Sequence, residues 1–184
     1  WEVVAMDPAQ RAGVLSHPAF LAVHSNRGDS GIVKRGVFTL EQLLCVHLGT
    51  PSDDISPVEE PPAEFNRAEA TSREELAVLH SSQPACVGCH RMIDPAGYGF
   101  ENYDAAGRFR LTEKEDVTID ASGTLRVHRE ELVFEDSPSY IRQIAGSRSL
   151  RTCLADQFFA YVLGEAPEGR ERDTFREGFV QSGG

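Results

Sequence analysis

The chain has 184 residues, of which 40% are hydrophobic and 26% are charged, a composition typical of one or at most two small globular domains. Its 18 Lys and Arg residues against 29 Asp and Glu residues give a formal net charge of −11, and the absence of a basic cluster argues against a nucleic-acid partner. The longest apolar runs, such as residues 20–23, are far shorter than the roughly 20 residues of a membrane-spanning helix, so we expect no membrane span.

Residues 1–49 are predicted to form an N-terminal region that packs on the remaining chain. Leu40, Leu44 and Leu48 recur every four residues and predict a short helix over residues 39–48 with one apolar stripe. Residues 50–66 contain four prolines and five acidic residues, which favours an extended acidic linker. Because the sequence opens on Trp1 without a signal-peptide pattern, we expect a processed product or fragment of a larger polypeptide.

Residues 67–184 are predicted to form a mainly α-helical domain. Ser72 and Glu75 have the spacing of a capping box, which starts a helix that ends near His80. Glycines, a proline and interleaved aromatic residues predict an aromatic-lined loop over residues 93–107. Residues 117–119 and 124–127 then predict a minor β-hairpin whose turn is residues 120–123.

The C-terminal part is predicted to be helical. Two helices are expected over residues 138–145 and 149–164, and the second places four apolar side chains on one face: Leu150, Leu154, Phe158 and Tyr161. The polar tail, residues 167–184, is predicted to add a terminal helix that is anchored by Phe175 and Phe179. The predicted fold class is therefore mainly α with a minor β-hairpin.

Residues 86–90, Cys-Val-Gly-Cys-His, are the pattern with the most specific chemistry. In this pattern two thiols bond covalently to the vinyl groups of haem, and the adjacent histidine binds the iron. One turn of backbone separates the two sulfurs by about the distance between the vinyl groups, and the next residue then projects its imidazole toward the iron. We therefore predict that Cys86 and Cys89 tether one haem c and that His90 is its axial ligand.

Two other chemistries use the same residue types. A thioredoxin-like redox pair requires a helix start that follows a strand, whereas a helix is predicted before Cys86. A zinc site requires four ligands, and only His80 or His128 is available to join Cys86, Cys89 and His90. Covalent haem is the interpretation that these patterns favour.

Several sequence blocks, taken together, resemble one protein family. They are residues 11–18, 35–38, 41–45, 86–90 with 93–95, 101–104 with 107–108, 119–123 and 161–164. In this order they resemble the C-terminal portion of the large planctomycete-type cytochrome c proteins of planctomycetes and myxobacteria. The resemblance spans about residues 8–164 and implies a small c-type cytochrome-like domain over residues 67–184, an N-terminal extension, and a remaining parent polypeptide outside this chain. It supports haem and an extracytoplasmic location more than any particular reaction.

The second axial ligand of such a haem would decide its chemistry. We predict His24, because it follows an apolar run and precedes a glycine-containing loop, from which a rigid segment can present a side chain to a pocket. The alternatives are an open or water-bound position and five other side chains: Met6, His17, His47, His80 and His128. Met92 lies too close to His90 in the chain to reach the opposite face.

Three further residues are candidates for contact with the haem. Tyr98 and Phe100 are expected to line its pocket, or otherwise to belong to the ordinary core. Arg108 is expected to neutralise a propionate through charge-assisted hydrogen bonds, or otherwise to be a solvated arginine.

Cys45 and Cys153 are the remaining cysteines, and each lies on or beside an apolar helix face. They could be two buried free thiols, but a disulfide is the stronger prediction because haem attachment through thioethers is completed outside the cytoplasmic membrane, where thiols also oxidise. A bridge across so long a loop contributes up to ~4 to 5 kcal/mol in the chain-entropy treatment.

The leading functional hypothesis is single-electron transfer by a periplasmic or cell-surface bacterial protein, rather than catalysis. The acidic surface favours a redox partner protein with a basic docking patch. One alternative is an open-site haem enzyme that uses peroxide or a small substrate, and another is a domain that supplies electrons to a larger catalytic protein. A third is a binding module in which the haem only stabilises the fold.

Overall fold

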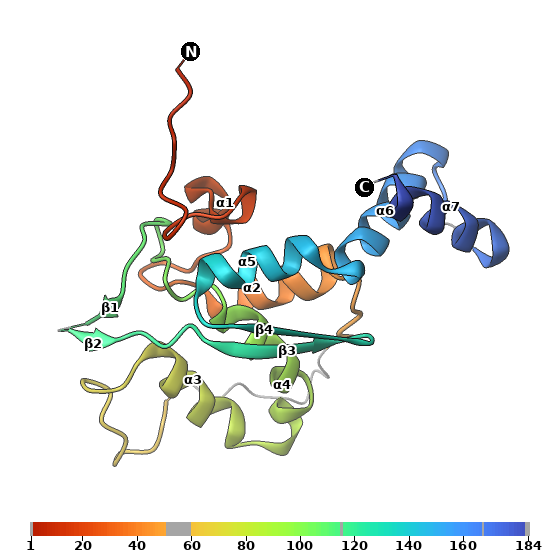
Figure 1. Cartoon of the computed structure of the whole chain (residues 1–184). Helices are drawn as coiled ribbons and strands as arrows, with labels where there is room; N and C mark the ends of the chain where they lie inside the picture. The colour runs from red at the N-terminus through yellow and green to blue at the C-terminus, as the bar shows by residue number, and fades with distance from the viewer. Residues whose placement is uncertain (1, 51–59, 115, 167, 183–184) are drawn as a thin grey trace.

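The computed structural model describes residues 2–50, 60–114, 116–166 and 168–182 (Figure 1). The fold is mainly α-helical with two small antiparallel hairpins, which confirms the predicted fold class. The helical segments are η1 (Val14–Ser16), α1 (Pro18–Val23), α2 (Ile32–Phe38), η2 (Thr39–Leu43), α3 (Ser72–Ser81), α4 (Pro84–Tyr98), α5 (Ser137–Gly146), α6 (Arg148–Leu163) and α7 (Gly169–Gln181). The strands are β1 (Thr112–Glu113), β2 (Val117–Thr118), β3 (Gly123–Val127) and β4 (Glu130–Phe134). Over the described residues, every helix is too short or too polar to cross a lipid bilayer.

The helix predicted over residues 39–48 has different bounds in the structure. α2 runs directly into the single π-helical turn η2, and the helical backbone ends where Cys45 adopts a left-handed conformation with φ of 50°. Leu40 and Leu44 are fully buried, as the apolar stripe predicted, but Leu48 lies beyond the helix. In the acidic linker predicted over residues 50–66, residues 51–59 lie outside the described part of the chain.

The N-cap of α3 lies one residue before the predicted one. Thr71, not Ser72, is the N-cap: its hydroxyl accepts the backbone N–H of Glu74, and the Glu74 carboxylate accepts the N–H of Thr71. The Ser72 N–H and hydroxyl instead donate to the buried carboxylate of Glu113, which ties the start of α3 to β1. The helix itself ends at Ser81, close to the prediction.

The loop predicted over residues 93–107 is wrong in its first half, because α4 continues through Pro95 to Tyr98. A proline inside a helix removes one hydrogen bond, but here α4 crosses α2 at very close range. A Cβ on Gly36 would lie 2.2 Å from the carbonyl oxygen of Ile93, and a Cβ on Gly97 would lie 2.2 Å from that of Ile32. Glycine is therefore required at this crossing rather than at a turn.

The predicted hairpin is also wrong in its pairing. β2 pairs with β1, while β3 pairs with β4, so the segment expected as a turn, residues 120–123, links two separate hairpins. In the larger hairpin Leu125 lies opposite Leu132, and alternate side chains of both strands face the core. Neither β1 nor β4 was predicted, and the turn between β3 and β4 uses His128 with φ of 52° in place of the usual glycine or asparagine.

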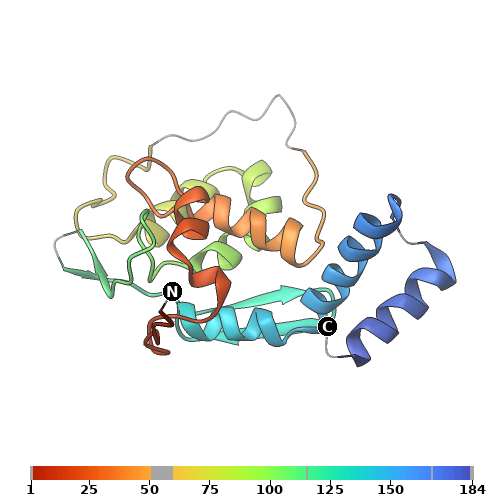
Figure 2. The same cartoon turned by 90° about the horizontal axis from the view of Figure 1, so that it is seen from above.

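The helices predicted over residues 138–145 and 149–164 are present as α5 and α6, and the terminal helix is α7. α5 packs against β4, whereas α6 and α7 form a pair that projects from one end of the molecule (Figure 2). Phe175 and Phe179 anchor α7 on Phe158, as predicted. The predicted apolar face of α6 is wrong, because Tyr161 is 87% exposed and the buried residues include Cys153 and Phe159.

Arg35 connects the N-terminal helices to the segment that follows α4. Its side chain is completely buried, and its guanidinium donates to four carbonyl oxygens and one hydroxyl: Leu21 O, Phe100 O, Tyr103 O, Asp104 O and Ser25 Oγ. Burial lowers the pKa of Arg35 to about 10, which leaves it protonated at neutral pH. A single buried cation thus holds two loops against α2.

Glu101 is a buried carboxyl group whose charge acts on Arg35. It is 1% exposed, it accepts a hydrogen bond from the Ser30 hydroxyl at 2.5 Å, and its second oxygen lies 3.7 Å from the guanidinium of Arg110. Burial raises the pKa of Glu101 to about 7, although Ser30, Arg110 and Arg35 oppose the shift. Near neutral pH this group therefore exchanges a proton inside the folded protein.

The raised pKa of Glu101 predicts a pH-dependent contribution to stability. Between about pH 4.5 and 7 the folded state holds a proton that the unfolded state has released, so the free energy of unfolding falls as pH rises through this window, by up to about 3 kcal/mol. Glu101→Gln removes this slope. Urea unfolding of both proteins at about pH 5 and pH 8 should show the variant gaining stability relative to the wild type at the higher pH. Parallel pH profiles of the two proteins would contradict the prediction.

Candidate functional site

The cysteine–histidine pattern lies in the first half of α4. Pro84 occupies the first turn of the helix, where its missing N–H costs nothing. Cys86, Cys89 and His90 follow at relative positions i, i+3 and i+4, so their side chains share one face of α4. The two sulfurs and the imidazole are thus presented together by a single rigid element.

The four cysteines divide into two pairs in the structure. Cys45 and Cys153 form a disulfide with an S–S distance of 2.05 Å, which confirms the predicted bridge. It joins the residue that ends the η2 region to the middle of α6. Cys86 and Cys89 are free thiols, and both are partly exposed. The only reduced cysteines of this sequence are therefore the two beside His90.

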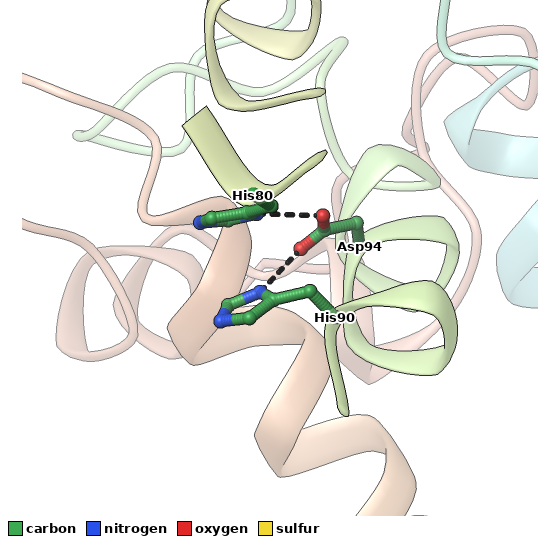
Figure 3. A group of neighbouring side chains, drawn as sticks. All are labelled: His80, His90 and Asp94. Atoms are coloured by element: carbon green, nitrogen blue, oxygen red, sulfur yellow. Dashed lines mark hydrogen bonds and ion pairs between the residues drawn. The ribbon is translucent and has the colours of Figure 1, made fainter. Parts of the chain in front are cut away.

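His90 belongs to a cluster of three side chains that the sequence analysis did not assemble. Asp94, one helical turn further along α4, accepts hydrogen bonds from His90 Nδ1 at 2.9 Å and from His80 Nδ1 at 2.6 Å (Figure 3). The two imidazole rings stack with their centroids 3.5 Å apart. His80 comes from the last turn of α3, which packs beside α4. Sequence reasoning considered His80 as a zinc ligand or a second axial ligand of haem, and not as a neighbour of His90 and Asp94.

The hydrogen bonds of Asp94 determine the tautomer of both imidazole rings. An ionised carboxylate only accepts hydrogen bonds, so each neutral ring carries its proton on Nδ1 and leaves the lone pair of Nε2 free. Both Nε2 atoms point away from Asp94 to the same side (Figure 3). Each residue of this trio offers a ligand atom, and these atoms lie within 4.8 Å of one another. The cluster therefore presents two imidazole nitrogens suited to a transition-metal ion.

A shallow cavity of about 250 Å³ lies beside the cluster. Ala77, Val87, Pro95 and Tyr98 form most of its wall around His80 and His90. Tyr98 is part of this wall, and burial raises the pKa of its phenol above the usual range. The guanidinium of Arg73 covers the phenol ring at 4.5 Å from its centroid.

The other predicted pocket residues lie elsewhere. Phe100 is fully buried in the main core against Phe20 and Tyr140, which is the ordinary core position. Arg108 is exposed and pairs with Asp104 in the loop after α4. Neither residue lines the cavity beside His90.

His24 ends α1 at a distance in the sequence and in the fold from this cavity. Its ring packs against Phe20 at 4.9 Å and Phe38 at 4.3 Å between centroids. Burial lowers the pKa of His24, and the charges of Arg35 and Lys34 lower it further. Within the described residues, the structure does not bring His24 to the cavity of His90.

The alternative axial ligands are not gathered there either. Met6 is 60% exposed in the N-terminal segment, and His17 is the N-cap of α1, where its Nδ1 accepts the N–H of Ala19. His128 Nε2 donates to the carbonyl oxygen of Leu44. Among the described histidines, only His80 contacts His90.

Comparisons with known proteins assign the chain to one family. The sequence profile of one family, PSCyt3, described as a protein of unknown function (DUF1588), matches residues 11–113. No curated protein and no solved structure matches the chain. The matched segment is more than half of the chain and includes all of α3 and α4, so it contains His80, Asp94 and residues 86–90. The chain therefore belongs to the PSCyt3 family, an uncharacterised family whose name points to a cytochrome-like domain.

Proposed function

We propose that Cys86 and Cys89 bind one haem c covalently, that His90 is an axial ligand of its iron, and that the domain transfers single electrons outside the cytoplasm. The observation that carries this proposal is the pairing of the cysteines. Cys45 and Cys153 are joined in a disulfide, whereas the two thiols beside His90 remain free on one face of α4. Thioether formation needs this arrangement of two reduced sulfurs and a neighbouring imidazole.

The residues around the pattern fit the cofactor with one adjustment. His90 keeps Nε2 available because Nδ1 is held by Asp94, and an apolar wall that includes Val87 and Tyr98 is in place. In its present conformation His80 obstructs haem binding, because its ring stacks on that of His90 and the Nε2 atoms of both rings face the same side. Its side chain must turn away to leave room around His90 Nε2. Rotation of a single, partly exposed side chain is a small change.

Bound haem would supply an iron that accepts or releases one electron. The chain's own residues would hold the group: Cys86 and Cys89 would bind it covalently to α4, and His90 would donate its Nε2 lone pair to the iron. The cavity is smaller than the ~300 to 1,000 Å³ of ligand sites that bury their ligand, so it would leave part of a bound haem uncovered. An exposed cofactor edge and a formal charge of −11 support electron exchange with a basic partner protein.

The location outside the cytoplasm is part of the proposal. The Cys45–Cys153 disulfide is the supporting observation, because structural disulfides persist in oxidising compartments. His90 is the only axial ligand that the proposal requires. A role for His24 would need its ring to leave the contacts with Phe20 and Phe38.

A second candidate function is binding of a transition-metal ion without haem. It is favoured by the arrangement of His80, His90 and Asp94, in which two Nε2 atoms face the same side and a carboxylate orients both rings. Zinc or copper would then occupy Nε2 of His80 and His90, and water would complete the coordination. In this case the thiols of Cys86 and Cys89 stay reduced.

The haem proposal is tested by expressing the full chain in the periplasm of a bacterium that attaches haem to such motifs. We expect an absorption spectrum with the reduced α-band of thioether-linked haem, and colour that stays with the protein after denaturation. Cys86→Ala with Cys89→Ala should abolish covalent attachment completely. The matched control, Cys45→Ala with Cys153→Ala, removes two cysteines but should retain the haem.

Two outcomes would overturn the haem proposal. One is a colourless wild-type protein in which both Cys86 and Cys89 react with a thiol reagent. The other is stoichiometric zinc or copper in the purified protein that is lost in a His80→Ala variant, which would establish the metal site instead.

A further inference from the structure

We propose that Asp94 is a positioning residue that makes His90 a strong electron donor and thereby lowers the reduction potential of the bound iron. This inference rests on the proposed haem site, and it assigns to that site the group that tunes it. Asp94 lies outside the Cys-x-x-Cys-His pattern.

The carboxylate of Asp94 is buried and forms hydrogen bonds with two histidines. It is 6% exposed, its two oxygens contact Nδ1 of His80 and Nδ1 of His90, and within the described part of the chain no arginine or lysine forms an ion pair with it. Burying a carboxylate is costly unless hydrogen bonds compensate. Here both oxygens accept from imidazole N–H groups, so the cost of burial is offset by contacts to the rings.

The position of the carboxylate is fixed by the helix crossing. Asp94 lies between Ile93 and Gly97, which both approach α2 closely at the helix crossing. The close approach of α2 and α4 leaves this part of α4 little freedom to shift. Because His90 is one turn away on the same helix, the Nδ1–Oδ1 distance of 2.9 Å is built into α4.

A carboxylate that accepts a hydrogen bond from Nδ1 changes how strongly Nε2 of the same ring binds a metal. It fixes the tautomer with a free Nε2, holds the ring plane, and raises the basicity of the nitrogen that faces the metal. A more basic ligand stabilises Fe(III) relative to Fe(II). The equilibrium Fe(III) + e⁻ ⇌ Fe(II) is therefore displaced toward the oxidised side, which is a lower reduction potential.

Asp94→Asn in the haem-loaded protein tests this inference. The amide is similar in size but carries no charge, so we expect the Fe(II)/Fe(III) ratio at a fixed potential to rise about tenfold, a shift of about 59 mV for a one-electron couple. Covalent attachment, measured by mass, should be unchanged. Spectroelectrochemical titration gives the potential.

His80→Ala is the matched control, because it removes the ring that must turn away to leave room for haem, and alanine cannot donate to Asp94. We expect its potential to stay close to that of the wild type or to fall, since the carboxylate is then left to His90 alone. A rise equal to that of Asp94→Asn would attribute the effect to general disruption of the cluster, and it would overturn the inference. An unchanged potential in Asp94→Asn would do the same.

A measurement on the wild type decides the question if Asp94→Asn does not fold. In the reduced, ¹⁵N-histidine-labelled holoprotein, we expect His90 Nδ1 to carry a slowly exchanging proton. Rapid exchange would contradict the hydrogen bond to Asp94. A wild-type protein without haem would instead refute the proposed function, and the mass of the purified chain distinguishes these two failures.

Discussion

Replacing Arg35 by alanine is expected to lower the free energy of unfolding by about 3 to 5 kcal/mol. The substitution leaves buried acceptors without a donor, among them the carbonyl oxygens of Tyr103 and Asp104 at 2.8 Å. It also removes one of the two arginines that oppose the raised pKa of Glu101, the other being Arg110. Because Arg35 bonds both Leu21 in α1 and Asp104 in the loop after α4, these segments should separate together. Urea unfolding measures the change.

Arg108→Ala is the matched control for Arg35. Arg108 also forms hydrogen bonds to a carboxylate, that of Asp104, but its side chain is 82% exposed, so its removal should cost less than about 1 kcal/mol. Arg35→Lys keeps the charge but lacks the planar fork of donors, and it should remain strongly destabilised. Similar losses for Arg35→Ala and Arg108→Ala would show that the buried network is not what stabilises this part of the fold.

Gly97→Ala is expected to destabilise the protein by about 3 kcal/mol although alanine favours helix formation. The added Cβ would lie 2.2 Å from the carbonyl oxygen of Ile32, and backbone atoms cannot turn away as a side chain does. α2 and α4 must move apart, which disturbs the helix that carries His90 and Asp94. Gly36→Ala, on the other side of the crossing, should have a similar effect because its Cβ would meet Ile93 O at 2.2 Å.

Gly88→Ala provides the control within the same helix. A Cβ at Gly88 meets nothing within 4 Å, so the substitution should be neutral or stabilise the protein by up to about 1 kcal/mol. Thermal and urea unfolding of Gly88→Ala and Gly97→Ala should thus change in opposite directions. A neutral Gly97→Ala would contradict the close helix crossing on which the position of Asp94 depends.

The parts of the fold that local sequence determines were predicted well. α3, α5, α6 and α7 each have an apolar pattern or a cap within their own residues, and they appear close to the predicted ranges. The prediction of a loop from Ile93 onward was wrong, because Pro95 and Gly97 have the same local preference for a turn whether or not α2 packs on them. Only the contact with α2 shows that Gly97 serves a helix crossing.

The candidate site was predicted in part, for the same reason. Cys86, Cys89 and His90 are adjacent in the sequence, so their common face follows from helical spacing. The partnership of His90 with Asp94 is an i, i+4 contact that the expected loop concealed. His80 reaches Asp94 only through the angle between α3 and α4, which no spacing rule supplies. His24 lies next to a rigid helix, as expected, but two phenylalanine rings hold it in the core around Phe20.

The most direct test of the account is the mass of the peptide that contains residues 86–90, taken from wild-type protein made in a cell that attaches haem to such motifs. The account predicts that this peptide carries the mass of one haem and that neither Cys86 nor Cys89 reacts with a thiol reagent. A peptide of unmodified mass with two reactive thiols, or with a disulfide between them, would contradict it.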